Sequence, residues 1–348
     1  MDDDKLALAV AHVAFPDGEL FTFPDLEPHG GADTDGYLAA CDDWLLFADH
    51  EYDVLHLTSP LTGETVLLPG LIDGVRVSDN PVVIANEPAP SGTAPRRWKH
   101  GEDMAVLKLV VCQGGLVAAI VGREHFAKVA LCNILEGEFV WSISAGDRWR
   151  SYDDMAFHDG RLYALTQDAD LLAFDVGYDD DDAGDEEPVV TRVERVVAGP
   201  ALEDECDDGE DARMHYLVAS LGGALLMVRR DMPDARTTDG FVVFEADLAA
   251  SRWVRVDRLD AGGEALFVGR LCSRAVRTPH DGDHIFFLDD ADGLSFRSED
   301  QPRPPYQVAA YDMARRTFST LMRRKKPWED GGTPMTWLFP DDGDVVTK

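Results

Sequence analysis

The chain has 348 residues, of which 45% are hydrophobic and 28% are charged, so it can bury a large core. The 66 Asp and Glu residues outnumber the 32 Lys and Arg residues, and the formal net charge of −34 repels nucleic-acid phosphates and anionic lipids. These values favour a globular protein and argue against nucleic-acid or membrane-surface binding.

The N-terminus, MDDDKLALAVAHVAF, opens with acidic residues, and its apolar run is short and interrupted by His12. It resembles neither a signal peptide nor a membrane span, so we expect an intracellular protein, cytoplasmic or nuclear. No CxxC pair occurs, and we expect the scattered cysteines to be free thiols in the core and the protein to need no cofactor. The cysteines are Cys41, Cys112, Cys132, Cys206 and Cys272.

Residues 55–69, LHLTSPLTGETVLLP, contain two apolar runs separated by Ser59, Pro60, Thr62 and Gly63. Proline cannot donate to a β-ladder, and glycine tolerates positive φ, so this composition is typical of a turn between two strands. The segment therefore predicts a β-hairpin.

The same pattern of apolar run, small-residue turn, apolar run and aromatic residue returns four more times along the chain. Consecutive turns lie roughly 45 to 63 residues apart, near or above the period of a four-stranded propeller blade. The predicted turn glycines are Gly63, Gly114, Gly115, Gly160, Gly222, Gly223 and Gly282. The aromatic residues expected to pack between blades are Trp44, Trp141, Trp253 and Phe318.

The two ends of the chain carry incomplete parts of this pattern. Residues 12–26, HVAFPDGELFTFPDL, predict a hairpin without further strands, and residues 333–340, TPMTWLFP, predict a strand without a neighbour. Pairing the terminal strands would complete one more blade and remove exposed edges. We therefore expect an all-β, kelch-like propeller with six blades over residues 1–348, five or seven being the alternatives. Acidic loop insertions are expected at about 178–188 and 203–212.

The order of several segments resembles a known family. These segments are HVAFPDGELFTFPDL, CDDWLLFADHEYDVLHLTSPLTGETVLLP, YLVASLGGALLMVRR, VFEADLAASRWVRV, EALFVGRLCSRAV and GDHIFFLDD. In this order they resemble the plant kelch-like propellers of the KIB type, also called domain of unknown function 295, over nearly the whole chain. The resemblance implies a propeller that selects the substrate of a cullin-based ubiquitin ligase, usually after an N-terminal F-box that docks on the ligase adaptor.

The first hairpin of this chain starts only about a dozen residues after Met1, so we expect no F-box within it. Binding to the ligase adaptor is then expected only if an F-box lies upstream.

Motifs with chemical potential each have a structural alternative. The segment HDGDH offers His280, Asp281, Asp283 and His284 as metal ligands, but Asp281-Gly282 is also hairpin-turn chemistry. Residues 288–299 mimic a calcium loop, yet Leu288 occupies the first ligand position and cannot coordinate the ion.

The basic run Arg323 to Lys326 fits either a nuclear-import signal or a solvated loop. Adjacent carboxylates, Asp153-Asp154 and Asp289-Asp290, need a defined geometry before they indicate catalysis. No nucleophile motif or glycine-rich phosphate loop occurs.

We therefore expect a monomeric, non-catalytic propeller that grips a protein partner through the loops on one face of the disc. The alternative is a small-ligand- or metal-binding enzyme that uses the central channel, with His280, Asp281, Asp283 and His284 as the first candidates.

Overall fold

The fold is taken from a computed structural model, which describes most of the chain. The described residues are 11–13, 20–22, 37–49, 51–88, 104–123, 126–135, 139–180, 186–200, 212–233, 237–259, 262–278, 282–290, 306–323 and 335–339.

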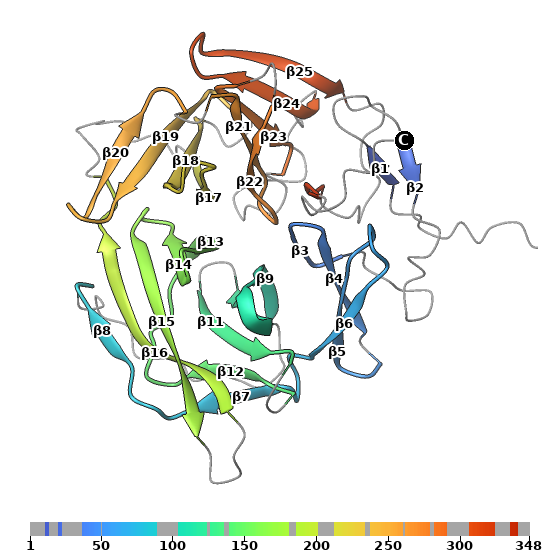
Figure 1. The fold of residues 1–348 in the computed structure, drawn as a ribbon, viewed down its shortest axis with the longest axis vertical. Helices are drawn as coiled ribbons and strands as arrows, with labels where there is room; N and C mark the ends of the chain where they lie inside the picture. Colours follow the sequence, from blue (N-terminus) through green and yellow to red (C-terminus); the bar gives the residue numbers. More distant parts are fainter. Residues whose placement is uncertain are drawn as a thin grey trace, which may run out of the picture.

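Five sheets of four or five strands are arranged in a ring, which confirms an all-β propeller (Figure 1). Blade 1 contains β3 (Ala39–Cys41), β4 (Trp44–Asp49), β5 (Val54–Thr58) and β6 (Thr65–Pro69). Blade 2 contains β9 (Ala105–Val111), β10 (Leu116–Arg123), β11 (Phe126–Asn133) and β12 (Trp141–Ser144). Blade 3 contains β13 (Tyr152–His158), β14 (Arg161–Thr166), β15 (Leu171–Asp180) and β16 (Glu186–Val197). Blade 4 contains β17 (Ala212–Ala219), β18 (Leu225–Met232), β19 (Gly240–Asp247) and β20 (Arg252–Val256).

Blade 5 departs from the simple meander of the others. It contains β21 (Glu264–Val268), β22 (Arg274–Arg277), β23 (His284–Leu288), β24 (Tyr306–Asp312) and β25 (Thr317–Arg323). The chain places β22 innermost, and β21 lies between β22 and β23, parallel to β23. The hairpin predicted for residues 55–69 is confirmed as β5 and β6, with Thr58 opposite Thr65.

The blades pack face to face because both sides of their strands are apolar. In β10, Val117, Ala119 and Val121 join the core shared with blade 1, whereas Ala118 and Ile120 join the core shared with blade 3. Successive strand residues point to opposite faces, so a strand without polar alternation is covered on both sides. Each of the five junctions between blades has its own buried cluster of this kind.

The expectation of six blades is wrong, because the terminal segments do not form a shared sheet. Strands β1 (Ala11–Val13) and β2 (Leu20–Thr22) pair only with each other among the described strands. Residues 335–339 form no strand; instead they fill the junction between blades 5 and 1. Phe339 is 8% exposed, its N–H donates to the carbonyl of Asp42 (3.0 Å), and the indole of Trp337 donates to the carbonyl of Val268 (2.9 Å). Aromatic side chains, not a β-ladder, thus close the ring.

A segment that we call the strap, residues 70–88, leaves blade 1 and runs along the outside of blades 2 and 3 before the chain enters β9. Its strand β7 (Val75–Ser78) pairs in parallel with β12, and its strand β8 (Val83–Ala85) pairs in parallel with β16 (Figure 1). Side chains fix it as well, since Arg76 pairs with Glu187 and Asn86 donates to Glu194 (3.0 Å). The strap therefore covers the outer edges of two blades.

The sequence predicts no membrane span near the N-terminus. In the described part of the chain, no helix is long and apolar enough to cross a membrane.

Replacing Phe339 by alanine tests the closure of the ring. We expect Phe339→Ala to lower the free energy of unfolding by about 3 kcal/mol, because it leaves a cavity between two blades. Denaturant unfolding followed by tryptophan fluorescence measures the loss. The matched control is Phe318→Ala, whose ring is 44% exposed and whose loss should be less than half as large. Equal losses would contradict a closing function for Phe339.

Candidate interaction face

The centre of the ring is built by the innermost strands, and β9 is adjacent to β3 and β13, β13 to β17, and β17 to β22. Lys108 of β9 and Asp154 of β13 form an ion pair there, with Nζ 2.6 Å from Oδ1 and exposures of 5% and 1%. The other carboxylate oxygen of Asp154 accepts the N–H of Leu217 in β17 (2.8 Å), and Lys108 reaches the carbonyl of Arg270 at 3.5 Å. One ion pair therefore links blades 2 to 5.

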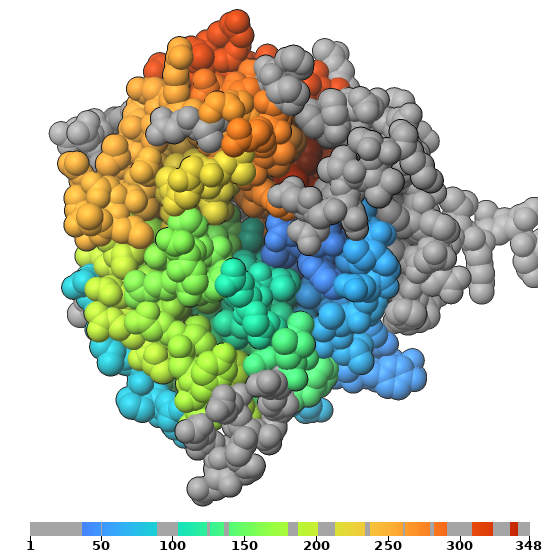
Figure 2. Space-filling view, viewed as in Figure 1, coloured from blue at the N-terminus to red at the C-terminus, as the bar shows by residue number. Residues whose placement is uncertain are grey.

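Burial opposes the charge on Lys108, but the attraction of Asp154 outweighs it and raises the pKa of the ammonium above its ordinary value. Each group needs the other, because burying either charge without a partner would cost several kcal/mol, on the order of 3 to 5. In the space-filling view, the coloured atoms of the blades meet around the centre of the disc (Figure 2).

The adjacent carboxylates noted in the sequence are engaged separately. Asp153 lies 2.6 Å from Nδ1 of His215 on β17, whereas its neighbour Asp154 binds Lys108. Asp290 accepts hydrogen bonds from the guanidinium of Arg230 (2.8 Å) and the N–H of Arg270 (2.7 Å). Asp153, Asp154 and Asp290 therefore connect neighbouring strands and blades.

The structure places part of the HDGDH segment in a turn. Asp283 has φ of 61°, and its Oδ1 accepts the N–H of Leu259 (2.7 Å). Nδ1 of His284 lies 3.0 Å from the carbonyl of Gly282, and its Nε2 is 3.9 Å from Asp312. The described residues contain no group of three or more His, Cys, Asp or Glu that could hold a metal ion.

Several predicted sites fall wholly or mostly outside the described residues. They are His280, Asp281, Cys206, the basic run after Arg323, the calcium-like loop after Asp290 and most of the two acidic insertions. The other four cysteines are free and buried, as predicted.

The predicted turn glycines lie between strands. Positive φ occurs at Gly63, Gly114, Gly115, Gly160 and Gly223, and Gly222 and Gly282 also lie in turns. At Gly115 a Cβ would approach Leu135 to 2.5 Å, so a larger residue would strain both the backbone and this contact.

The predicted aromatic residues differ in what they contact. The buried indole of Trp141 donates to the carbonyl of Pro69 in blade 1 (2.8 Å), and the indole of Trp253 in blade 4 donates to Ala169 in blade 3 (2.9 Å). Trp44 packs against the core between blades 1 and 2. Phe318 instead contacts Tyr311 and Phe287 of its own blade.

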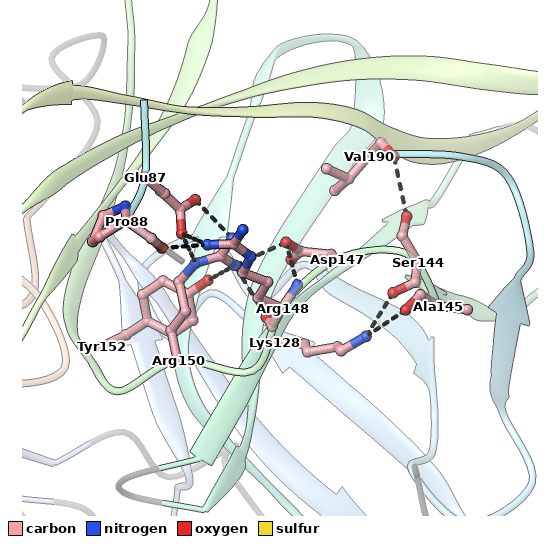
Figure 3. A network of polar contacts seen from close by, with 10 residues as sticks. All are labelled: Glu87, Pro88, Lys128, Ser144, Ala145, Asp147, Arg148, Arg150, Tyr152 and Val190. Carbon is pink, nitrogen blue, oxygen red and sulfur yellow. Dashed lines mark hydrogen bonds and ion pairs between the residues drawn. The ribbon is translucent and has the colours of Figure 1, made fainter. Parts of the chain in front are cut away.

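A polar network fixes the end of the strap against blade 2 and the start of blade 3 (Figure 3). The guanidinium of Arg150 makes two hydrogen bonds to the carboxylate of Glu87 (2.8 and 3.1 Å) and one to Asp147 (2.8 Å). Lys128 donates to the carbonyl of Ser144 (2.7 Å), and burial lowers the pKa of this ammonium. Paired, bidentate contacts of this kind hold a segment in a fixed geometry.

In blades 1 to 4, which share one strand order, the turns between the first and second strands and between the third and fourth strands lie on the same side of the disc. Internal bonds join these turns: Oγ of Ser59 donates to Asp43 (2.6 Å), and the N–H of Ile134 donates to the carbonyl of Gly115 (2.9 Å). Four of these turns carry an exposed leucine at the tip. We call the surface formed by these leucines the turn side; it comprises Leu61 (44% exposed), Leu135 (72%), Leu221 (44%) and Leu248 (42%).

The turn side is rigidly supported. The N–H of Leu221 donates to buried Glu264 of blade 5 (2.7 Å), and the N–H of Leu135 donates to Oδ1 of Asn133 (3.0 Å). Exposed apolar residues on anchored turns can contact a partner with little loss of conformational freedom. The sequence shows a leucine in each of these turns. It does not show that the leucine side chain is exposed, so the turn side could not be predicted from it.

The family model of the KIB1-4 beta-propeller matches residues 13–312. The chain belongs to this family. Membership of the KIB1-4 family agrees with the resemblance seen in the sequence and favours a protein-interaction function. No curated protein matches the chain.

Solved structures show only distant similarity to this KIB1-4 propeller. An oligogalacturonate lyase in complex with manganese has 9% identity and a TM-score of 0.39, covering 92% of this chain and 73% of the lyase. The Dos1 propeller has 10% identity and a TM-score of 0.38, covering 85% of this chain and 74% of that one. A PQQ-bound aldose sugar dehydrogenase from Streptomyces coelicolor has 11% identity and a TM-score of 0.26, covering 77% and 93%. At this similarity these proteins carry no argument about function.

Substitutions at the central ion pair test its contribution. We expect Lys108→Met to lower the free energy of unfolding by about 3 to 5 kcal/mol, because Asp154 stays buried without a counter-charge. The double variant Lys108→Met/Asp154→Asn should recover much of the loss, since the amide oxygen still accepts a hydrogen bond and no charge remains. Denaturant unfolding measures both variants; a double variant less stable than Lys108→Met would show that the ion pair is not the cause.

Proposed function

We propose that this propeller is a protein-interaction module that recognises its partner with the turn side. The observation that carries the proposal is the set of exposed leucines on hydrogen-bonded turns of three blades. Loops on a rigid scaffold are a common place for binding residues. Family membership supports the same class of function.

The finer proposal is that the bound partner is a substrate of a cullin-based ubiquitin ligase. It rests on the resemblance to F-box-associated propellers of the KIB type. In this arrangement the propeller makes no covalent change itself. It holds the substrate while an F-box segment contacts the ligase adaptor.

The buried groups at the centre support recognition over chemistry. Lys108 and Asp154 satisfy each other and nearby backbone groups, and Arg230 and Asp290 do the same farther out. Groups held in such pairs stabilise the ring. Recognition is therefore assigned to side chains that point outward.

A pair of charge substitutions tests the turn side. We expect Leu135→Asp/Leu248→Asp to reduce partner recovery at least about tenfold in quantitative co-purification, because the interface would bury two carboxylates without partners. Unfolding measurements should show an unchanged fold, since both side chains are exposed.

The matched control is Tyr52→Asp/Ile72→Asp on the opposite side of the disc, where the side chains are 70% and 51% exposed. We expect this variant to keep the partners. Equal partner recovery from the wild-type protein and the turn-side variant would disprove the assignment.

The ligase proposal has a separate test. Two proteins are mixed separately with the F-box-binding adaptor: the chain as given, and a version lengthened at its N-terminus by any residues encoded upstream at the same locus. Capture by the extended version only would support recognition by the propeller with recruitment by an upstream F-box. Failure of both versions to bind would remove the ligase proposal and leave the interaction proposal standing.

A further inference from the structure

The outer edges of the five blades are treated differently by the chain. The strap covers β12 with β7 and β16 with β8, both in parallel pairing. Among the described strands, β6, β20 and β25 are the last in their sheets. An uncovered edge presents unpaired N–H and C=O groups that can pair with another chain.

Two of these three edges carry features that discourage pairing. β6 ends at Pro69, which cannot donate a hydrogen bond. β20 is five residues long, and its Arg252 and Arg255 are both exposed. Proline and charged side chains are the usual means by which proteins protect an edge.

β25 has no such protection over most of its length. Thr317 to Met322, TFSTLM, contains no charge and no proline, and Thr317 to Leu321 are all exposed. Phe318 is 44% exposed and Leu321 is 46% exposed. Figure 1 shows this strand at the outer edge of the ring, at the top of the view.

We propose that β25 is a docking edge for an extended segment of a partner protein, which adds to blade 5 as a parallel strand. The fold shows this pairing twice within the molecule, since β7 and β8 add in parallel to the outermost strands of blades 2 and 3. Main-chain hydrogen bonds would supply affinity, and Phe318 and Leu321 would supply contacts for the side chains of the segment.

The charges beside β25 define the chemistry of this segment further. Arg315, which is 79% exposed and paired with Asp312, and Arg316, which is also exposed, form the turn before the strand. In parallel pairing the N-terminal end of the added segment lies beside this turn. The segment that fits best therefore has an acidic residue followed by an uncharged or β-branched run.

The strap itself contains a related sequence, because Asp73 precedes the β-branched Val75 and Val77, with Arg76 between these two. A labelled synthetic peptide of residues 72–80, IDGVRVSDN, is therefore a defined probe, and its binding to the full chain can be followed by fluorescence anisotropy. We expect saturable binding to the wild-type protein. Hydrogen exchange should show protection of β25 amides when the peptide is present.

Ser319→Pro and Thr320→Pro form a matched pair of variants. Adjacent strand residues direct their N–H groups to opposite edges, so one proline removes an outward donor and the other removes a donor to β24. We expect the variant that loses its outward N–H donor to weaken peptide binding at least about tenfold without lowering the melting temperature. The variant that loses its N–H donor to β24 should lower the melting temperature. Leu321→Lys leaves the backbone unchanged and should also weaken binding, and Val254→Pro on β20 should leave it unchanged.

Three results would overturn the proposal. The first is no saturable binding to the wild-type protein up to about 1 mM peptide. The second is unchanged binding in both proline variants and in Leu321→Lys. The third is a concentration-dependent dimer that Leu321→Lys dissolves, because the edge would then take a second copy of this chain. The inference does not depend on the turn side, since the substitutions at β25 leave that surface intact.

Discussion

Face-to-face packing of blades is the constraint on which this structure depends. Inner strands such as β10 are apolar on both sides, so a blade is covered only when it has a neighbour on each side. A row of blades would leave two apolar faces exposed, and the ring must therefore close. Phe339 and Trp337 contribute to this closure between blades 5 and 1. At the centre, Lys108 and Asp154 place opposite charges where the inner strands meet, which adds a specific polar contact to a non-directional hydrophobic force.

The sequence predicts the class of fold well because the evidence for it is local and repeated. The hairpin at residues 55–69 and the glycine turns depend on neighbouring residues only, and five repeats of the pattern correspond to five blades. The blade number was wrong because residues 333–340 have the composition of a strand. Whether such a segment joins a ladder or fills a gap between blades depends on distant residues, here Phe267 and Tyr37. The strap was missed for a similar reason, since β7 and β8 are short and pair with strands far along the chain.

The polar sites were harder to predict than the fold. In an acidic chain, the sequence cannot separate Asp154, which binds Lys108, from Asp153, which binds His215, because both partners come from other blades. The sequence of residues 280–284 fits both a hairpin turn and a metal site. Of this segment, Asp283 and His284 are described, and they contact nearby backbone groups and Asp312. Exposure is equally invisible in the sequence: Leu135 and Leu131 are two leucines of one segment, but one is 72% exposed and the other fully buried.

Under the proposed function, different groups of this molecule provide stability and recognition. Buried side chains carry the contacts that join blades, so a change at Lys108 or Trp141 affects two blades at once. Turns and outer edges contact fewer neighbours, so their side chains can vary with the partner while the ring is kept. The two kinds of surface also differ in what they can recognise. A turn presents side chains and reads the shape of a folded partner, whereas an edge strand presents backbone groups and reads an extended one. A propeller with both can hold one partner in two ways, and the linked contacts raise the effective affinity without any single strong site.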